Sequence, residues 1–448
     1  MTHLMKIIRA TAGDSRRAAI LLGAAALAAC SGDSLTRVEL PDVATADAVA
    51  GKTGLPTVLA GAVGEFQVAF GGSGGNEGQV VLSGLFADEL TNVSTFSQHR
   101  EIDARSIPLD NSIMTPAFLA LHRARVRAEQ TAASYAELDP AAVGRAHALN
   151  LAGFSYLLFG ENYCSGVPYS TVGADGAFAF GAPVATDSTF RLAIGRFDEA
   201  AVAATAVGGA AGATQLQLAK VGKARALLAL GRYADAKQAV DGVAPSFAFR
   251  VEHSGNSNRQ FNGVYMYTQS GRRFSVSDRE GTNGLAWRSD ADPRTPSARG
   301  AGASQDNTAI WYAQAKHADR GDDIVLASGL EAELVRAEAE LNAGDANWIA
   351  RLNALRATVS LPALSAPADG ESRARLLFRE RAEWLWLTGH RLGDLRRLVR
   401  VYRLDASRVY PVGIADNRTG PYGTDLSFPL PSDEQNNPGF ATCDTATP

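Results

Sequence analysis

Beyond residue 50, apolar side chains recur mostly at intervals of three and four residues, the spacing that places them on one face of an α-helix. The first of these segments predict helices over residues 54–70, 117–137 and 141–159. The second ends before Pro140, because proline cannot continue a helix. The pattern therefore indicates a largely helical protein.

Three later stretches repeat one design, a helix followed by a tight turn and a second helix. They cover residues 216–243, 328–357 and a segment that begins at Glu371 and turns at Gly389. A looser pair lies around residues 190–206. The segment Leu230-Gly231-Arg232-Tyr233 resembles the middle of a tetratricopeptide unit, in which small residues let two antiparallel helices touch. Stacked pairs of this kind form a curved scaffold, so we predict an all-α dominated fold of tetratricopeptide-like helix pairs.

Residues 246–320 differ in composition: they are rich in Gly, Ser, Asn, Asp and Arg, and their apolar residues lack helical spacing. Alternating residues at 264–268 and 274–276 predict short strands. A long irregular insert in a helical protein is usually functional or disordered, and its aromatic content argues against disorder. We therefore expect long loops and a few short strands to carry the binding site.

The candidate ligand-binding residues combine aromatic rings with polar neighbours, as carbohydrate sites do, because sugars offer flat apolar faces fringed with hydroxyls. The insert supplies Tyr265, Tyr267, Trp287, Trp311 and Tyr312. A second, smaller patch consists of Asn92, Phe96 and Gln98. For each ring the alternative is a core position under the long loops, and the sequence leaves this open.

Charge and composition exclude several classes of function. The formal net charge is −4, and no basic run is longer than the pair Arg396-Arg397, so nucleic acid is not an expected partner. The seven histidines are scattered and no C-x-x-C pair occurs, so neither a metal site nor a cofactor is expected.

Catalytic candidates are weak. Glu380 and Glu383 are a carboxylate pair, but arginines alternate with them and Arg379 reaches Glu383 at helical spacing, which predicts a solvated face of ion pairs. His390 and Asp394 have the same spacing without a third ligand, which predicts a structural hydrogen bond. We therefore expect a binding protein and no enzyme.

The N-terminus carries a targeting signal. Basic residues precede an apolar run that is too short to cross a bilayer, so residues 1–29 are predicted to be a signal peptide. The run ends in Leu27-Ala28-Ala29-Cys30, which resembles the bacterial lipobox and predicts lipidation of Cys30. Residues 30–50 then form a flexible tether. The alternative is a plain secreted protein with a cysteine at the cleavage point.

Two further cysteines, Cys164 and Cys443, would face an oxidising compartment in an exported protein. We expect them to form a disulfide that ties the C-terminus to the first third of the chain. Two unrelated thiols are the alternative.

The C-terminal third resembles the SusD/RagB-like family. The resemblance rests on a late helix with its G-H-R turn and D-L-x-R segment, over residues 379–397, and on Phe428-Pro429-Leu430-Pro431 followed by Asn437-Pro438-Gly439-Phe440. Further matches occur in order along the chain, at residues 157–168, 290–294 and 334–345. Leu392-Gly393 replaces the family's usual aromatic pair, and residues 161–166 are inserted before Val167-Pro168.

This resemblance implies a single SusD-like domain over residues 51–448 and an outer-membrane lipoprotein that faces the cell exterior. Such a protein would capture a glycan oligomer, or a peptide, and pass it to a SusC-like TonB-dependent outer-membrane barrel. The alternatives are a tetratricopeptide-type lipoprotein scaffold that binds protein partners and, third, a lipid-anchored hydrolase.

Overall fold

The computed structural model describes residues 47–173, 177–414 and 420–448. The chain divides into two compact units, Met1–Ala50 and Gly51–Pro448. The described part of the first unit holds a short 3₁₀ helix, Asp47–Val49. The predicted signal peptide, the lipidation site Cys30 and most of the predicted tether lie outside the described residues.

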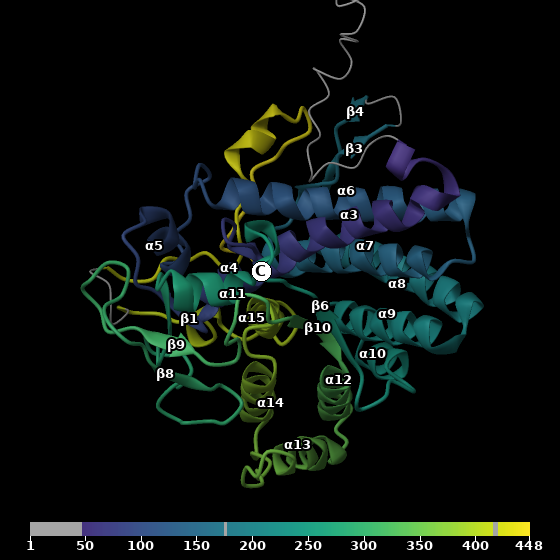
Figure 1. Cartoon of the computed structure of the whole chain (residues 1–448). Helices are drawn as coiled ribbons and strands as arrows, with labels where there is room; N and C mark the ends of the chain where they lie inside the picture. Colours follow the sequence, from purple (N-terminus) through teal and green to yellow (C-terminus); the bar gives the residue numbers. More distant parts are fainter. Residues whose placement is uncertain (1–46, 174–176, 415–419) are drawn as a thin grey trace, which may run out of the picture. The chain divides into compact units, whose positions relative to one another are not determined.

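Helices dominate the unit Gly51–Pro448, which confirms the predicted fold class (Figure 1). They are α3 (Gly51–Gly71), α4 (Gly78–Ala87), α5 (Ser97–Asp103), α6 (Met114–Leu138), α7 (Val143–Asn162), α8 (Thr186–Val207), α9 (Gly209–Ala229), α10 (Tyr233–Ala239), α11 (Gly263–Tyr265), α12 (Gly329–Asn342), α13 (Asn347–Ala357), α14 (Gly370–Trp384) and α15 (Arg391–Arg400). Within the described ranges, none of them has both the length and the apolar character needed to cross a bilayer.

Short strands between the helices form two-stranded antiparallel sheets. The pairs are β1 (Leu90–Asn92) with β7 (Phe274–Val276), β2 (Val167–Pro168) with β5 (Pro183–Val184), β3 (Thr171–Val172) with β4 (Phe178–Ala179), β6 (Ala248–Val251) with β10 (Ile324–Ser328), and β8 (Ser297–Arg299) with β9 (Tyr312–Gln314). Strand β7 lies where the alternation predicts it.

The strand predicted over residues 264–268 is wrong. These residues form α11 and a π-helical turn, Met266–Ser270. The Asn262 side chain accepts a hydrogen bond from the backbone N–H of Tyr265, at 3.0 Å, and so caps the helix start. Local capping therefore outweighs the alternating pattern here.

Small residues allow the helices α7, α8 and α9 to pack closely around one aromatic ring. Phe197 of α8 is buried between Gly153 of α7 and Gly222 of α9. A Cβ atom on Gly153 would lie 2.7 Å from the Phe197 ring, and one on Gly222 would lie 2.4 Å from it. Larger side chains at either position would separate the helices, because the core is close-packed.

The turn between α9 and α10 has the predicted tetratricopeptide-like form. Gly231 has a φ of 69°, a conformation that glycine adopts without strain. The ring of Tyr233, directly after the turn, packs against Tyr402, with ring centroids 6.1 Å apart. The aromatic residue thus fills the space beside the turn.

Helices α12, α13 and α14 enclose a smaller core. Its buried members are Leu334, Ala337, Trp348, Leu352, Leu377 and Leu385. Side chains cap two of the helices: the hydroxyl of Ser328 accepts from the N–H of Glu331, and the carboxylate of Asp369 accepts from the N–H of Ser372.

The carboxylates Glu380 and Glu383 lie in ion pairs, but not on a solvated face. Arg379 Nε lies 3.0 Å from Glu383 Oε1, as the spacing predicts. Glu380 is nevertheless only 1% exposed, and Arg294 Nη1 lies 2.7 Å from its Oε2. The solvated face predicted from the sequence is wrong, because the insert brings Arg294 over the helix and buries the pair.

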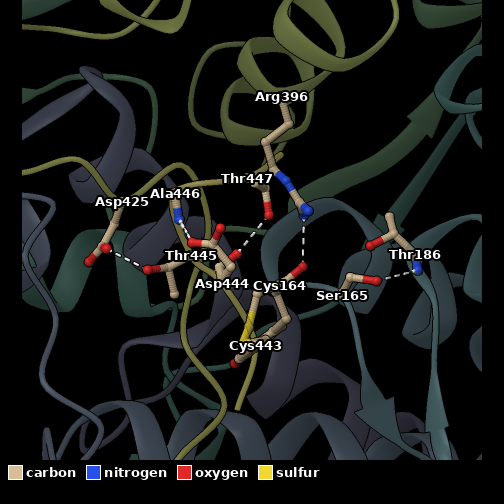
Figure 2. The surroundings of a disulfide bond; sticks show 11 residues. Cys164, Ser165, Thr186, Arg396, Asp425, Cys443, Asp444, Thr445, Ala446 and Thr447 are labelled. Atoms are coloured by element: carbon tan, nitrogen blue, oxygen red, sulfur yellow. Dashed lines mark hydrogen bonds between the residues drawn. A yellow bond between two sulfur atoms is a disulfide. The ribbon is translucent and has the colours of Figure 1, made fainter. Parts of the chain in front are cut away.

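A disulfide joins Cys164 and Cys443, the two cysteines expected to pair, with Cα atoms 5.8 Å apart (Figure 2). Arg396 of α15 lies next to it and donates from Nη1 to the carbonyl of Tyr163, at 2.9 Å. The backbone N–H of Cys164 donates to the carbonyl of Phe428. Covalent and backbone bonds together fix the C-terminal segment to the end of α7.

Candidate functional site

Two segments that are far apart in the sequence meet at the pair of strands β1 and β7. Asn92 is the register partner of Phe274. Beyond these residues, the N–H of Val93 donates to the carbonyl of Arg273, at 2.9 Å. The sheet therefore brings the patch that contains Phe96 next to the aromatic insert.

Phe96 lies at the surface between β1 and α5, and its ring is stacked on a cation. Its side chain is among the exposed large apolar residues, at 39% exposure. The guanidinium carbon of Arg273 lies 4.7 Å from the centroid of the Phe96 ring and 5.3 Å from that of Tyr267. A ring held in this way offers apolar area together with hydrogen-bond donors, which is the combination a sugar ring requires.

Buried polar contacts fix the loop that carries Phe96. His99 is 1% exposed; its Nδ1 lies 3.0 Å from Ser94 Oγ and its Nε2 lies 2.9 Å from Glu77 Oε1. The His99 ring also meets the Phe96 ring edge to face, with centroids 5.3 Å apart. The position of Phe96 is therefore set before any ligand binds.

Ser94 contacts His99 and His99 contacts Glu77, as the serine, histidine and acid of a catalytic triad do, but the geometry does not suit Ser94 as a nucleophile. The Ser94 hydroxyl donates to Asn92 Oδ1 at 2.7 Å, so its proton points away from His99. Ser94 is also 2% exposed. These three side chains brace the loop.

Residues of the insert supply polar groups close to Phe96. Gln305 Oε1 accepts a hydrogen bond from the backbone N–H of Thr95, at 2.7 Å. The N–H of Gln305 donates to the carbonyl of Arg272, and the N–H of Asp306 donates to the carbonyl of Val93. Polar groups of Thr95, Gln305 and Arg273 thus lie on the segments next to the exposed Phe96 ring, and we name these four residues the Phe96 surface.

Three of the aromatic candidates are core residues. Tyr267 is 4% exposed and stacks on Phe274, with centroids 5.7 Å apart. Trp287 is 2% exposed and stacks on Trp386, at 6.3 Å. Trp311 is 5% exposed and packs against Gly300, where a Cβ atom would lie 2.1 Å from the indole. The prediction that these rings face a ligand is corrected, because protein covers them.

The other candidates occupy different positions. Asn92 is buried and accepts from the backbone N–H and hydroxyl of Ser94. Gln98 is partly exposed on α5, and Tyr265 is partly exposed on α11. Tyr312 is partly exposed beneath Arg288, whose guanidinium carbon lies 3.8 Å from the ring centroid. Phe96 is therefore the candidate with the most accessible ring.

Arg273 and Gln305, like Thr95, belong to the Phe96 surface but were not predicted from the sequence. The dipeptide Arg272-Arg273 directly before the predicted strand at 274–276 is the signal that points to the first. Gln305 has no such signal, because only the folding of its loop onto residues 93–95 places it there.

In the part of the chain that the structure describes, no three His, Cys, Asp or Glu side chains are grouped so that they could hold a metal ion.

Two ionisable groups, the buried Glu89 and the partly exposed Lys316, lie next to each other beside β1. Burial raises the pKa of Glu89 to about 8 and lowers that of Lys316 to about 8. Glu89 Oε1 accepts from the N–H of Leu387, at 2.9 Å, and Lys316 Nζ donates to the carbonyl of Trp386. These contacts attach both β1 and the insert to the turn between α14 and α15.

Comparison with known proteins identifies the fold of this chain. No protein-family model matches the sequence, and no curated protein matches it. Solved structures do match. A SusD-like carbohydrate-binding protein from Bacteroides vulgatus is similar with a TM-score of 0.59 and 18% identity, over 78% of this chain and 84% of that one.

A SusD superfamily protein from Parabacteroides distasonis has a TM-score of 0.65 at 14% identity, over 87% of this chain and 98% of the other. A laminarin-binding SusD-like protein has a TM-score of 0.64 at 14% identity, over 88% and 99%. The chain therefore has the fold of SusD-like proteins.

Proposed function

We propose that this protein binds a glycan oligomer at the Phe96 surface and delivers it to a SusC-like TonB-dependent outer-membrane transporter. In this proposal the chain breaks no bond. It is held at the outer membrane by a lipid on Cys30, with the unit Gly51–Pro448 facing the cell exterior. Residues 30–50 act as the tether.

The observation that carries the proposal is the exposed Phe96 ring, held by Arg273 and His99 and bordered by polar groups. Aromatic area with hydrogen-bond donors and acceptors at its edge is the pattern of a sugar site. The fold supports the same conclusion, since similar structures include a carbohydrate-binding protein and a laminarin-binding protein.

Calorimetry with a panel of glycan oligomers, including those of laminarin, tests the binding step. We expect Phe96→Ala to weaken glycan binding about tenfold or more, because it removes the stacking area. Leu192→Ala is the matched control, since Leu192 lies on α8 and is 40% exposed, close to the 39% of Phe96. Equal glycan affinity in the two variants would contradict the assignment of the site.

The anchor and the transport partner require separate tests. Labelling cells with a clickable fatty acid is expected to mark the wild-type protein and not Cys30→Ser. Chemical cross-linking on cells, followed by mass spectrometry, is expected to recover a TonB-dependent barrel. An unlabelled wild-type chain, or cross-links to periplasmic proteins alone, would refute the corresponding step.

A further inference from the structure

A concave surface lies along α6 and shares no residue with the Phe96 surface. Its cavity has a volume of about 490 Å³, within the range of small-molecule sites. Helix α6 forms one wall, and the strands β3 and β4 and the 3₁₀ helix Ser432–Asn436 form the other (Figure 1). We call this cavity the α6 groove.

The groove exposes apolar side chains on both walls. Phe178 is 57% exposed and Phe180 is 54% exposed, and their rings meet edge to face with centroids 4.9 Å apart. Leu119 of α6 is 42% exposed and Val126 lies two turns further along the same face. A cluster of exposed aromatic and aliphatic groups in one concavity marks a binding site.

Opposite charges line the two walls without meeting. Arg123, Arg125 and Arg127 belong to α6, whereas Asp433 and Glu434 belong to the 3₁₀ helix. Within the described residues, no ion pair links these arginines to Asp433 or Glu434; Arg123 instead lies 3.8 Å from Glu65. Glu65 also lines the groove and compensates Arg123, so Arg125 and Arg127 are the cations that the groove keeps apart from Asp433 and Glu434.

Both walls hold charges that are poorly compensated by the protein. Arg125 is 2% exposed and has no carboxylate within ion-pair distance in the described ranges; it donates to the carbonyl of Ser170, and its Nε has no hydrogen-bond partner there. Two tyrosine rings, Tyr156 and Tyr169, lie 5.9 and 5.5 Å from its guanidinium carbon. Burial and the neighbouring Asp433 raise the pKa of Glu434. A buried or half-buried charge without a partner is costly, so a ligand that supplies the counter-charge binds favourably.

We propose that the α6 groove binds a short apolar peptide with free termini. The terminal carboxylate lies toward the arginines of α6, the terminal ammonium group lies toward Asp433 and Glu434, and the apolar side chains lie on Phe178, Phe180 and Leu119. A neutral glycan would satisfy neither wall, and an apolar anion would leave the acidic wall unpaired. This inference does not depend on the proposed glycan function.

Calorimetry of the full chain with the tripeptide of leucine tests the proposal. We expect binding of the free peptide, and about a tenfold loss on acetylating its amine or amidating its carboxylate, because each change removes one charge interaction. Equal binding of free and doubly blocked peptides would overturn the proposed recognition of both termini. Absence of binding by the free peptide would overturn the proposal itself.

Variants then locate the peptide. Glu434→Gln should weaken binding of the free peptide and leave the affinity of the acetylated peptide unchanged, since the substitution and the acetylation remove the same interaction. Phe178→Ser should weaken binding of both the free and the acetylated peptide. Val202→Ser, at a 73% exposed position on α8, should leave both affinities unchanged. Unchanged peptide binding by Phe178→Ser would refute the site.

The two sites give independent readouts. Phe96→Ala should leave peptide binding intact, and Phe178→Ser should leave glycan binding intact. Loss of glycan binding in Phe178→Ser would instead identify the α6 groove as a sugar site and overturn the peptide assignment.

Discussion

Arg225 and Glu161 form a two-point ion pair in the interior of the helical scaffold. Arg225 Nε lies 2.6 Å from Glu161 Oε1, and Nη2 lies 2.6 Å from Oε2. Both side chains are less than 5% exposed. The pair joins α9 to α7, and Arg225 also donates to the carbonyl of Gly389 before α15, so one guanidinium connects three separate segments.

Arg225→Met is expected to lower the free energy of unfolding by about 3–5 kcal/mol, because it leaves Glu161 buried without a counter-charge. Urea denaturation measures the change. The matched control is Arg232→Met, whose partner Asp235 is 47% exposed, and there we expect a loss of at most about 1 kcal/mol. Similar losses in both variants would show that the buried pair has no special role.

Helices α6 and α8 could be predicted from sequence because each keeps a polar face. Helix α4 was missed for the opposite reason: all of its residues, 78–87, are buried, so no polar face gives a period. Fold class and helix positions thus follow from local patterns wherever one side of the element faces water.

Site residues were harder to predict, because their exposure depends on distant partners. Trp287 is covered by Trp386 and Trp311 by Gly300, and neither contact leaves a local trace in the sequence. His390 fails for the same reason. It was expected to bond to Asp394, but its Nε2 lies 3.1 Å from Glu331 Oε1, while Asp394 accepts from Arg381. The exposed ring of Phe96 became a candidate because its loop has polar neighbours on both sides.

Removing the disulfide should destabilise the chain without changing its fold. The sequence separation of Cys164 and Cys443 is 279 residues, and in the chain-entropy model a loop of this length corresponds to about 5–6 kcal/mol. We expect the double variant Cys164→Ala, Cys443→Ala to melt at a lower temperature than the wild type. A reductant should lower the melting temperature of the wild type and leave that of the double variant unchanged; equal sensitivity would contradict the pairing.

Glu89 gives stability a specific dependence on pH. Because burial raises its pKa from 4.5 to about 8, the folded chain binds more protons than the unfolded chain between these values, so the free energy of unfolding falls as the pH rises. Lys316, whose pKa is lowered to about 8, changes its protonation near and above the upper end of this range. Comparing the wild type with Glu89→Gln isolates the contribution of Glu89, because the other groups contribute equally to both proteins. Urea denaturation at about pH 5 and about pH 8 should show a larger loss for the wild type than for Glu89→Gln. Parallel pH profiles would mean that Glu89 is ionised in the fold.

Gly300 is expected to tolerate no side chain, because an added Cβ would lie 2.1 Å from the indole of Trp311. Gly300→Ala should therefore lower the free energy of unfolding by about 1–3 kcal/mol, the usual effect of overpacking. The control is Gly61→Ala on α3, where no atom lies within 4 Å of the new Cβ and the residue is exposed; alanine there should stabilise the helix by about 0.5–1 kcal/mol. Opposite signs for the two substitutions in urea denaturation support the close contact at Trp311. The same sign for both would mean that the loop at Gly300 moves away, in which case Trp311 is free to become exposed and returns as a candidate for ligand binding.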